Sequence, residues 1–536
     1  MRSRFTFTIA AAVAALSTAA HAMHVDPQGL GQVLVFPYYT ANGGNDTVIA
    51  ISNSTAHAKA LKVRFHEGYD GRGVLDFDVY LRAHGQWSAS VTSSGDEASL
   101  ARLVTSEDAC TVPAFTALPS GTHAIDFSDA SYAGENTLSA PTGEADGGPT
   151  TADRTREGHF DVFEMGEVTG NGHGSLDAID ASDCAALRDA WADGGYWTAN
   201  ASADVSAPAG GLYGTAYVVD VARGTMFGTG AVAIDGFSGA VQHSAPGAAA
   251  PDLDSATPAA GGRYEAVVAA NGSLLDLSYA DPVDAVSALF MSDALRGDII
   301  HSSSLGALTD WVVTAPTKRF YADPKRTGGV GHAAAAPFET GFAEAYVGGQ
   351  ETHGGVVVDQ WGSSFPYACE KTGATAYARD GSALALGAFD SGGEVDGAPS
   401  GWSNPVVTPC LETSVFAFAL ALDQQNLAEP QSAIGSELLD TTDGHVGRVY
   451  DLGSAVLPDA GSVFVDFAHD LAGSPITAHR LAADANGNVL VGLPVVAFVA
   501  TTFVNGNVAD GVLSNYSASA PVHGRVSCVN GAGSCR

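Results

Sequence analysis

The sequence predicts a mainly β protein made of two or three β-sandwich (Ig-like) domains with a few short helices. Three observations support this prediction: polar and apolar residues alternate in short segments, turn residues separate these segments by roughly 8–14 residues, and helical periodicity is rare. The chain has 536 residues, of which 46% are hydrophobic. It is therefore too long for one ordinary domain and apolar enough to form several cores.

The most regular strand pattern lies between residues 33 and 91. Around Val63, every second residue is apolar, which is typical of a half-buried strand. The apolar face holds Leu61, Val63 and Phe65, and the other face holds Lys62, Arg64 and His66. Five segments of this region are expected to be strands: Val33–Phe36, Thr47–Ile51, Leu61–His66, Leu75–Leu81 and Gln86–Val91.

Two later segments show helical periodicity. Asp180–Asp183 resembles a capping box, and the apolar residues that follow recur at helical spacing as far as Trp191. A second helix should begin with Pro282 at its first position and stop near Gly297. Its apolar stripe is formed by Val283, Val286, Leu289 and Phe290. Strands are expected again at Trp311–Thr314, Ser414–Leu422, Ser462–Phe467 and Leu490–Val504.

Residues 1–22 have the form of a secretory signal peptide. Arg2 and Arg4 precede an apolar run, and Ala20-His21-Ala22 resembles a cleavage site. The mature chain is therefore expected outside the cytoplasm, either extracellular or at the cell surface, with the periplasm as a further possibility. No later apolar stretch approaches the roughly 20 residues that a membrane helix needs, so no transmembrane segment is expected in the mature chain.

The remaining chain is expected to form three units. An N-terminal β-sandwich domain should span residues 23–115, and a C-terminal β-sandwich domain should span residues 301–536. A middle β-rich domain, residues 116–300, should hold both helices and two long loops. These loops are expected at Ala130–Arg154 and Ser244–Gly262, which are rich in glycine, proline and small residues.

Six cysteines remain after the signal peptide, and an even number in an exported chain predicts disulfides. Six cysteines allow 15 pairings, of which we favour the one that joins neighbours in the sequence. The favoured pairs are Cys110–Cys184, Cys369–Cys410 and Cys528–Cys535.

The charge balance limits the classes of partner. The chain holds 59 acidic and 24 basic residues, a formal net charge of −35. Nucleic acids and anionic membranes bind clustered lysine and arginine, so neither is an expected partner. The acidity favours solubility, and cation binding is the alternative. Asp484, Asn486 and Asn488 could offer oxygen ligands to calcium, although a plain hairpin turn explains the same residues.

One segment concentrates positive charge in this acidic chain. Lys318, Arg319, Lys325 and Arg326 fall within ten residues. They could bind an anionic ligand or a neighbouring subunit, or they could pair with the chain's own carboxylates.

No catalytic or cofactor-binding residue can be assigned from the sequence. Asp76 and Asp78 lie on one strand face, about 7 Å apart by strand geometry, and paired carboxylates serve glycoside hydrolysis. A solvated strand face explains the same two residues. No cysteine or histidine pattern indicates a zinc site.

Several segments taken together resemble a family of uncharacterised exported, cell-surface proteins of Gram-negative bacteria. The segments are Gly31–Tyr39, Gly44–Asn53, Ala60–Glu67, Val74–Leu81, Arg156–Gly166, Asp310–Tyr321 and Gly492–Phe498. The resemblance spans most of the mature chain and implies an extracytoplasmic, mostly β protein. It implies no catalytic residues.

These observations favour a secreted cell-surface or extracellular-matrix protein with a structural or adhesive role, which binds a protein or glycan at the cell surface. The alternative is a secreted carbohydrate-active hydrolase whose carboxylates converge only in the folded chain. A convergent acidic cleft would favour the hydrolase. A sealed surface with an exposed apolar patch would favour the binding protein.

Overall fold

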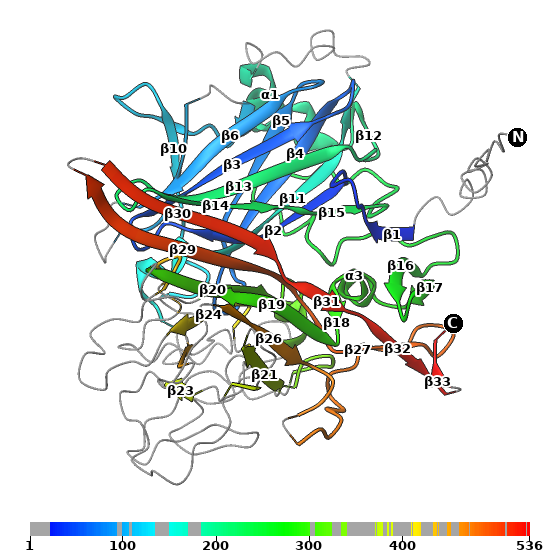
Figure 1. The fold of residues 1–536 in the computed structure, drawn as a ribbon. Helices are drawn as coiled ribbons and strands as arrows, with labels where there is room; N and C mark the ends of the chain where they lie inside the picture. Colours follow the sequence, from blue (N-terminus) through cyan, green and yellow to red (C-terminus); the bar gives the residue numbers. More distant parts are fainter. Residues whose placement is uncertain are drawn as a thin grey trace, which may run out of the picture.

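In the computed structural model, the chain folds mainly into β-strands with a few short helices (Figure 1). The predicted fold class is therefore confirmed. The structure describes residues 22–93, 99–106, 110–133, 149–169, 184–300, 306–323, 334–339, 370, 372–378, 383–384, 387–389, 409, 411–419, 432–436, 438, 448–451, 460–470, 472–509, 512–531 and 533–535.

The largest sheet follows the order β17-β16-β1-β15-β2-β11-β4-β5-β8, and β12 pairs with β11 outside this path. All of its pairings are antiparallel except that of β1 with β16. Its strands are β1 (Ala22–Val25), β2 (Val33–Thr40), β4 (Ala58–Glu67), β5 (Gly73–Leu81), β8 (Cys110–Val112), β11 (Glu157–Val168), β12 (Val205–Ser206), β15 (Val232–Asp235), β16 (Tyr264–Ala270) and β17 (Ser273–Tyr279).

A second sheet packs against the first and follows the order β14-β13-β3-β6-β7-β10-β9. Its strands are β3 (Asn45–Asn53), β6 (Gln86–Thr92), β7 (Arg102–Thr105), β9 (Thr116–Ala117), β10 (His123–Asp126), β13 (Leu212–Asp220) and β14 (Thr225–Gly230). One apolar core joins both sheets. At its centre the Phe160 ring stacks on Phe36 at 4.2 Å and on Phe65 at 4.8 Å between ring centroids. This is the sandwich that the alternating pattern predicts.

The C-terminal strands form two further sheets, with orders β22-β21-β26-β19-β31 and β23-β25-β24-β20-β29-β30, and two small ribbons, β18-β28 and β27-β32-β33. Their bounds are β18 (Met291–Ser292), β19 (Ala294–Ile300), β20 (Ala307–Thr314), β21 (Gly373–Ala378), β22 (Ala383–Leu384), β23 (Gly387–Phe389), β24 (Thr413–Ala419), β25 (Arg448–Asp451), β26 (Ala460–Asp466), β27 (Val489–Val491), β28 (Leu493–Pro494), β29 (Val496–Ala509), β30 (Val512–Pro521), β31 (His523–Arg525), β32 (Ser527–Asn530) and β33 (Gly533–Ser534).

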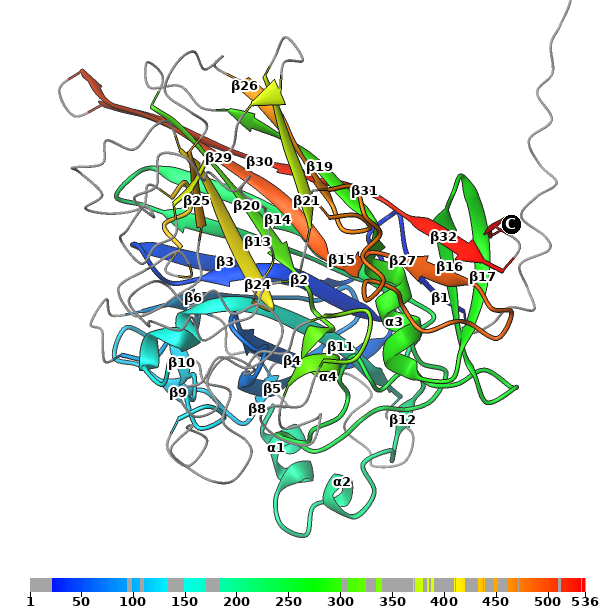
Figure 2. The same cartoon turned by 90° about the horizontal axis from the view of Figure 1, so that it is seen from below.

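These C-terminal sheets pack directly on the first sandwich. Figures 1 and 2 both show the orange and red strands on one side of the blue and cyan ones. Val35 of β2 belongs to the same buried cluster as Trp311 of β20 and Val465 of β26. The Tyr38 ring lies 6.1 Å from the Phe498 ring of β29. The two halves of the described chain therefore share apolar packing.

The sequence places the early strands correctly, because the five segments predicted between residues 33 and 91 lie in β2 to β6. Strands that are far apart in the sequence pair with each other in the sheets. β11 follows the expected boundary at residue 115, yet it pairs with β2 and β4, which precede that boundary. The division into domains at residues 115 and 300 stays a prediction.

The helices are η2 (Ala152–Arg156), α1 (Cys184–Trp191), α2 (Tyr196–Ala199), α3 (Pro282–Phe290) and α4 (Lys318–Ala322). Both predicted helices are confirmed, as α1 and α3. Pro282 occupies the first turn of α3, and the Asp281 carboxylate accepts a hydrogen bond from the Val283 amide at 2.9 Å.

Gly297 does not end this helix, contrary to the prediction. The helix stops at Phe290, and Gly297 lies inside strand β19. A Cβ atom at Gly297 would lie 2.7 Å from Cζ2 of Trp311, so the glycine makes room for the indole ring. The predicted strand Leu490–Val504 is divided into β27, β28 and β29.

Two of the three predicted disulfides are confirmed. Cys110 is bonded to Cys184, with their Cα atoms 4.9 Å apart, and Cys528 is bonded to Cys535, with a Cα separation of 5.4 Å. The first attaches α1 to β8 at the edge of the large sheet. Cys369 and Cys410 lie outside the described residues.

We predict that the two disulfides differ in their effect on stability. Cys110–Cys184 closes a separation of 74 residues, whereas Cys528–Cys535 closes one of 7. Because loop-closure entropy grows with loop length, replacing the first pair by serines should lower the free energy of unfolding by about 2 kcal/mol more than replacing the second. Chemical denaturation of both double variants measures this difference, and equal losses would contradict it.

Candidate functional site

The polar face of β4 is buried, contrary to the prediction of a half-buried strand. Lys62 and His66 are almost fully inaccessible, although they lie opposite the apolar core residues of the same strand. The segment between residues 244 and 262, which forms an irregular loop as predicted, contributes to this cover. Lys62 Nζ donates to the Ala245 carbonyl at 3.2 Å, and Arg64 donates to the Ala249 and Pro251 carbonyls.

Asp76 and Asp78 are likewise held in this interface and do not form a solvated strand face. Lys62 Nζ lies 3.3 Å from Oδ1 of Asp76 and 3.0 Å from Oδ1 of Asp78. Arg64 Nε lies 3.0 Å from Asp76 Oδ2. Burial raises the pKa of Asp78 to about 7, and the nearby Lys62 opposes this rise. The pair is thus engaged by cations of the neighbouring strand.

Arg319 is the centre of a buried group of charges. It lies in α4, and its guanidinium enters the covered face of the large sheet. Nη2 lies 2.7 Å from Asp252 Oδ1 and 3.6 Å from Asp161 Oδ2, and Nη1 lies 2.9 Å from Glu412 Oε1. Nη1 also donates to the Pro316 carbonyl at 2.7 Å. With the nearby His66 and His159, Arg319 and its three carboxylates form what we name the Arg319 cluster.

The Arg319 cluster combines distant parts of the sequence in a space without solvent. Asp161 comes from β11, Asp252 from the covering loop and Glu412 from the residue before β24, and all are buried. Desolvation alone would lower the pKa of Arg319, but the three carboxylates raise it above its ordinary value. Burial raises the pKa of Asp161 to about 7 and that of Glu412 to about 8, against the effect of Arg319. Arg319 therefore stabilises the charged form of both groups against the effect of burial.

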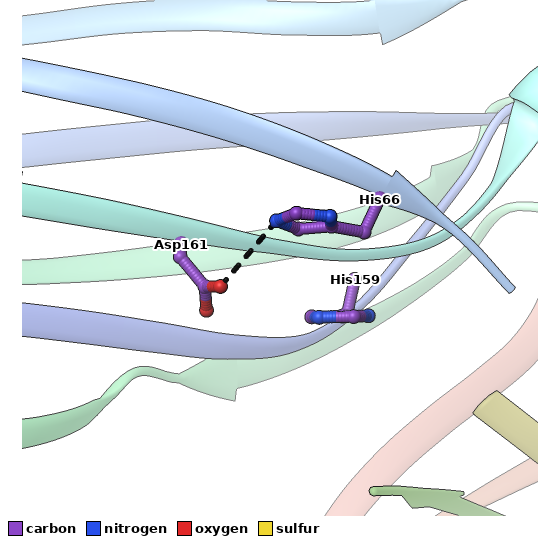
Figure 3. Close-up of side chains that lie close together, drawn as sticks. All are labelled: His66, His159 and Asp161. Atoms are coloured by element: carbon purple, nitrogen blue, oxygen red, sulfur yellow. Dashed lines mark ion pairs between the residues drawn. The ribbon is translucent and has the colours of Figure 1, made fainter. Parts of the chain in front are cut away.

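His66 and His159 are neutral members of the cluster. They lie opposite each other in the β4–β11 register, and their rings stack with centroids 5.0 Å apart (Figure 3). Burial lowers the pKa of both well below the ordinary value, and Arg319 lowers it further. His66 Nδ1 lies 2.9 Å from the Gly71 carbonyl, which can only accept, so this nitrogen carries the proton. Its Nε2 faces Asp161 Oδ2 at 3.6 Å.

Two histidines and an aspartate in contact are the ligand types of many metal sites. The ligand atoms of His66, His159 and Asp161 lie within 4.8 Å of one another. Two observations nevertheless argue against a metal centre. The ring planes of His66 and His159 differ by only 17°. Nitrogen lone pairs in two nearly parallel planes do not point at one common ion. Arg319 also lies 3.3 Å from His159 Nε2, where its guanidinium already supplies the positive charge. The residues do not fit a metal ion.

The structure places the predicted basic residues inside the protein as far as it describes them. Lys318 and Arg319 are both buried, and Lys318 Nζ lies 3.4 Å from Glu370 Oε1. These two residues pair with the chain's own carboxylates, which is one of the alternatives that the sequence left open. Lys325 and Arg326 lie outside the described residues.

The predicted calcium turn has the hydrogen bonds of an Asx turn. Asp484 Oδ1 accepts from the amides of Asn486 and Asn488, both at 2.8 Å. Asp484 Oδ2 accepts from the Asn488 side chain at 3.2 Å. Both carboxylate oxygens thus stabilise the turn itself, and calcium binding there stays a prediction.

An aromatic cluster surrounds His243 next to the disulfide of α1. Trp191 Nε1 donates to the Tyr80 hydroxyl at 2.7 Å, and this hydroxyl lies 2.8 Å from His243 Nε2. The second nitrogen, Nδ1, contacts the Ala201 carbonyl. A neutral ring with its proton on Nδ1 satisfies all three contacts. Burial lowers the pKa of His243 to about 4, in agreement with this assignment.

The outer face of the seven-stranded sheet has the opposite character from the Arg319 cluster. Alternate residues of β3, β13 and β14 point away from the core and are exposed or half-exposed, except the buried Ser52. We name this surface the β13 face; its residues are Asp46, Val48, Ala50, Ser52, Tyr213, Thr215, Tyr217, Val219, Met226, Gly228 and Gly230. The exposed fraction is 46% for Tyr213 and 37% for Tyr217. The face carries one formal charge, at Asp46, and four exposed large hydrophobic side chains.

Comparison with known proteins gives no assignment: no family model, curated protein or solved structure matches the chain. Among the described residues, no helix is both long enough and apolar enough to cross a membrane.

We predict that Arg319 is required for stability. Arg319→Met leaves three buried carboxylates without their cation, and breaking such a group should cost about 3–5 kcal/mol of unfolding free energy. The control is Arg102→Met, which removes an exposed pair with Asp126 and should cost less than about 1 kcal/mol. Urea denaturation compares the two variants, and similar losses would show that the buried arginine is not needed.

We predict a pH-dependent contribution from His243. Its pKa in the folded chain, about 4, is lower than the ordinary 6.5, so its stabilising effect is complete above pH 6.5 and falls as the pH drops towards 4. Between pH 7 and pH 5, the wild type should lose about 2 kcal/mol of unfolding free energy relative to His243→Gln. Denaturation curves at both pH values test this, and parallel pH profiles would contradict it.

Proposed function

We propose that this chain is an exported cell-surface protein with a structural or adhesive role, which acts by binding and not by catalysis. The observation that carries the proposal is the contrast between the buried, paired charges of the large sheet and the exposed, nearly uncharged β13 face. The carboxylates of the covered sheet face are held by cations: Asp76 and Asp78 contact Lys62. Arg319 holds Asp161, Asp252 and Glu412. Four exposed large hydrophobic side chains, Val48, Tyr213, Tyr217 and Met226, lie together on the β13 face. An exposed patch of this kind marks an interaction surface.

The same contrast argues against the carbohydrate-active hydrolase. A pair of catalytic carboxylates needs access to the glycosidic bond and to water. Asp76 and Asp78 contact Lys62 and are covered by a loop that donates the Gly247 amide to Asp76.

Two further observations support export. The pairs Cys110–Cys184 and Cys528–Cys535 need an oxidising compartment. The N-terminal residues have the composition of a signal peptide, and the resemblance to exported surface proteins of Gram-negative bacteria agrees with this. A sandwich fastened by disulfides suits a protein that must hold its shape outside the cell.

We predict that the tagged chain, expressed in a Gram-negative host, will be accessible to antibody and to added protease on intact cells. The matched control lacks residues 2–22 and should stay inside the cell, protected from both reagents. The purified chain should also release no reducing ends from dye-linked polysaccharides. Cytosolic protein with reduced cysteines, or measurable sugar release, would overturn the proposed function.

A further inference from the structure

The β13 face is continuous across three hydrogen-bonded strands. Tyr217 of β13 lies opposite Val48 of β3 on one side and Gly228 of β14 on the other. In the next rows, Thr215 lies opposite Ala50, and Tyr213 lies opposite Ser52. Tyr213 and Tyr217 are four residues apart on one strand, which places them about 13 Å apart along the sheet.

Gly228 shapes this surface. A Cβ atom at residue 228 would lie 3.1 Å from Cε1 and 3.3 Å from Cδ1 of Tyr217. The tyrosine ring therefore extends over the glycine, where any side chain would displace it. Tyr217 keeps 37% of its surface exposed.

The β14 edge of this sheet, which borders the β13 face, is closed, so a ligand there meets the face and not a free strand edge. Ser517 Oγ of β30 accepts from the Met226 amide and donates to the Met226 carbonyl, both at 2.6 Å. Asn515 donates to the Arg223 carbonyl at 2.6 Å, and Ser519 donates to the Gly228 carbonyl. The backbone of β14 is therefore already bonded to side chains, and no additional strand can pair there.

The charge of the surface selects the kind of ligand. Asp46 is the one charged residue of the β13 face, in a chain with a formal charge of −35. An anionic polymer is repelled by the whole chain, and a cationic partner would find one carboxylate on the face. A neutral ligand carries no charge that would have to be stripped of water when it binds to this surface. Exposed tyrosine rings offer apolar surface with a polar hydroxyl, and serine and threonine hydroxyls lie between and beside them.

Resting on the proposed function, we propose that the β13 face binds a neutral polysaccharide, with Tyr213 and Tyr217 packing against sugar rings. The C–H faces of sugar rings are apolar and their edges carry hydroxyl groups, which matches tyrosine rings set among hydroxyl side chains. The separation of the two tyrosines along one strand favours an extended polymer that reaches both over a single small sugar.

The test is co-sedimentation of the purified full chain with insoluble cellulose and with insoluble chitin. The wild type should be retained by at least one of them, and Tyr213→Ala/Tyr217→Ala should bind about tenfold more weakly. The matched control is Tyr377→Ala, because Tyr377 is 40% exposed in β21, outside the face, and should leave binding unchanged. Soluble polygalacturonate serves as the anionic probe and should not compete.

Several outcomes would overturn the inference. Equal binding by the double variant and the wild type would remove the face from recognition. Binding to polygalacturonate alone, or a change from dimer to monomer in the double variant on gel filtration, would assign a different occupant. If the chain is displayed on cells but neither insoluble polysaccharide retains it, the ligand class is wrong while the proposed function stands. If it is not displayed, the proposed function itself fails.

Discussion

The burial of Arg319 is the interaction on which the arrangement of this fold depends. Taking a guanidinium out of water costs several kcal/mol, and the cost is met only if carboxylates surround it with good geometry. Here Asp161, Asp252 and Glu412 do so from three separate segments of the chain. A displacement of α4, of the covering loop or of the start of β24 would leave a buried charge unpaired. The cluster therefore specifies how the C-terminal sheets dock on the first sandwich, beyond what apolar packing alone would specify.

Local features of this fold can be predicted from the sequence, and long-range ones cannot. The alternation around Val63 identifies β4, and Asp281 with Pro282 identifies the start of α3, because each signal lies within the element itself. Whether the Lys62 side of β4 faces water depends on Asp252, Arg319 and Glu412, which lie between 190 and 350 residues further along the chain. No local pattern contains that information. The same holds for His159 and Asp161, whose place in the cluster depends on Arg319.

The two sheets of the first sandwich reverse the usual arrangement of charges and exposed apolar groups. The large sheet buries Lys62, His66 and His159 on the face opposite its core, whereas the seven-stranded sheet exposes tyrosine, valine and methionine. Buried charges are tolerated only with partners, and an exposed apolar face invites association. The buried charges and the exposed apolar side chains both lie on the faces that point away from the sandwich core, so packing of that core does not explain them. The buried charges therefore match the segments that cover the large sheet. The exposed apolar side chains of the β13 face are left open to a binding partner.

The C-terminal region determines both features. It supplies Arg319 and Glu412, which complete the buried Arg319 cluster, and it supplies β30, whose serines bond to the backbone of β14 beside the exposed face. Without β30, the backbone of β14 would be open to pairing with another strand, and the apolar surface beside it would favour aggregation. With β30 in place, the exposed surface is limited to side chains on a rigid sheet. The adhesive role that we propose needs this combination, because the tyrosine rings must stay accessible while the backbone edge of β14 stays closed.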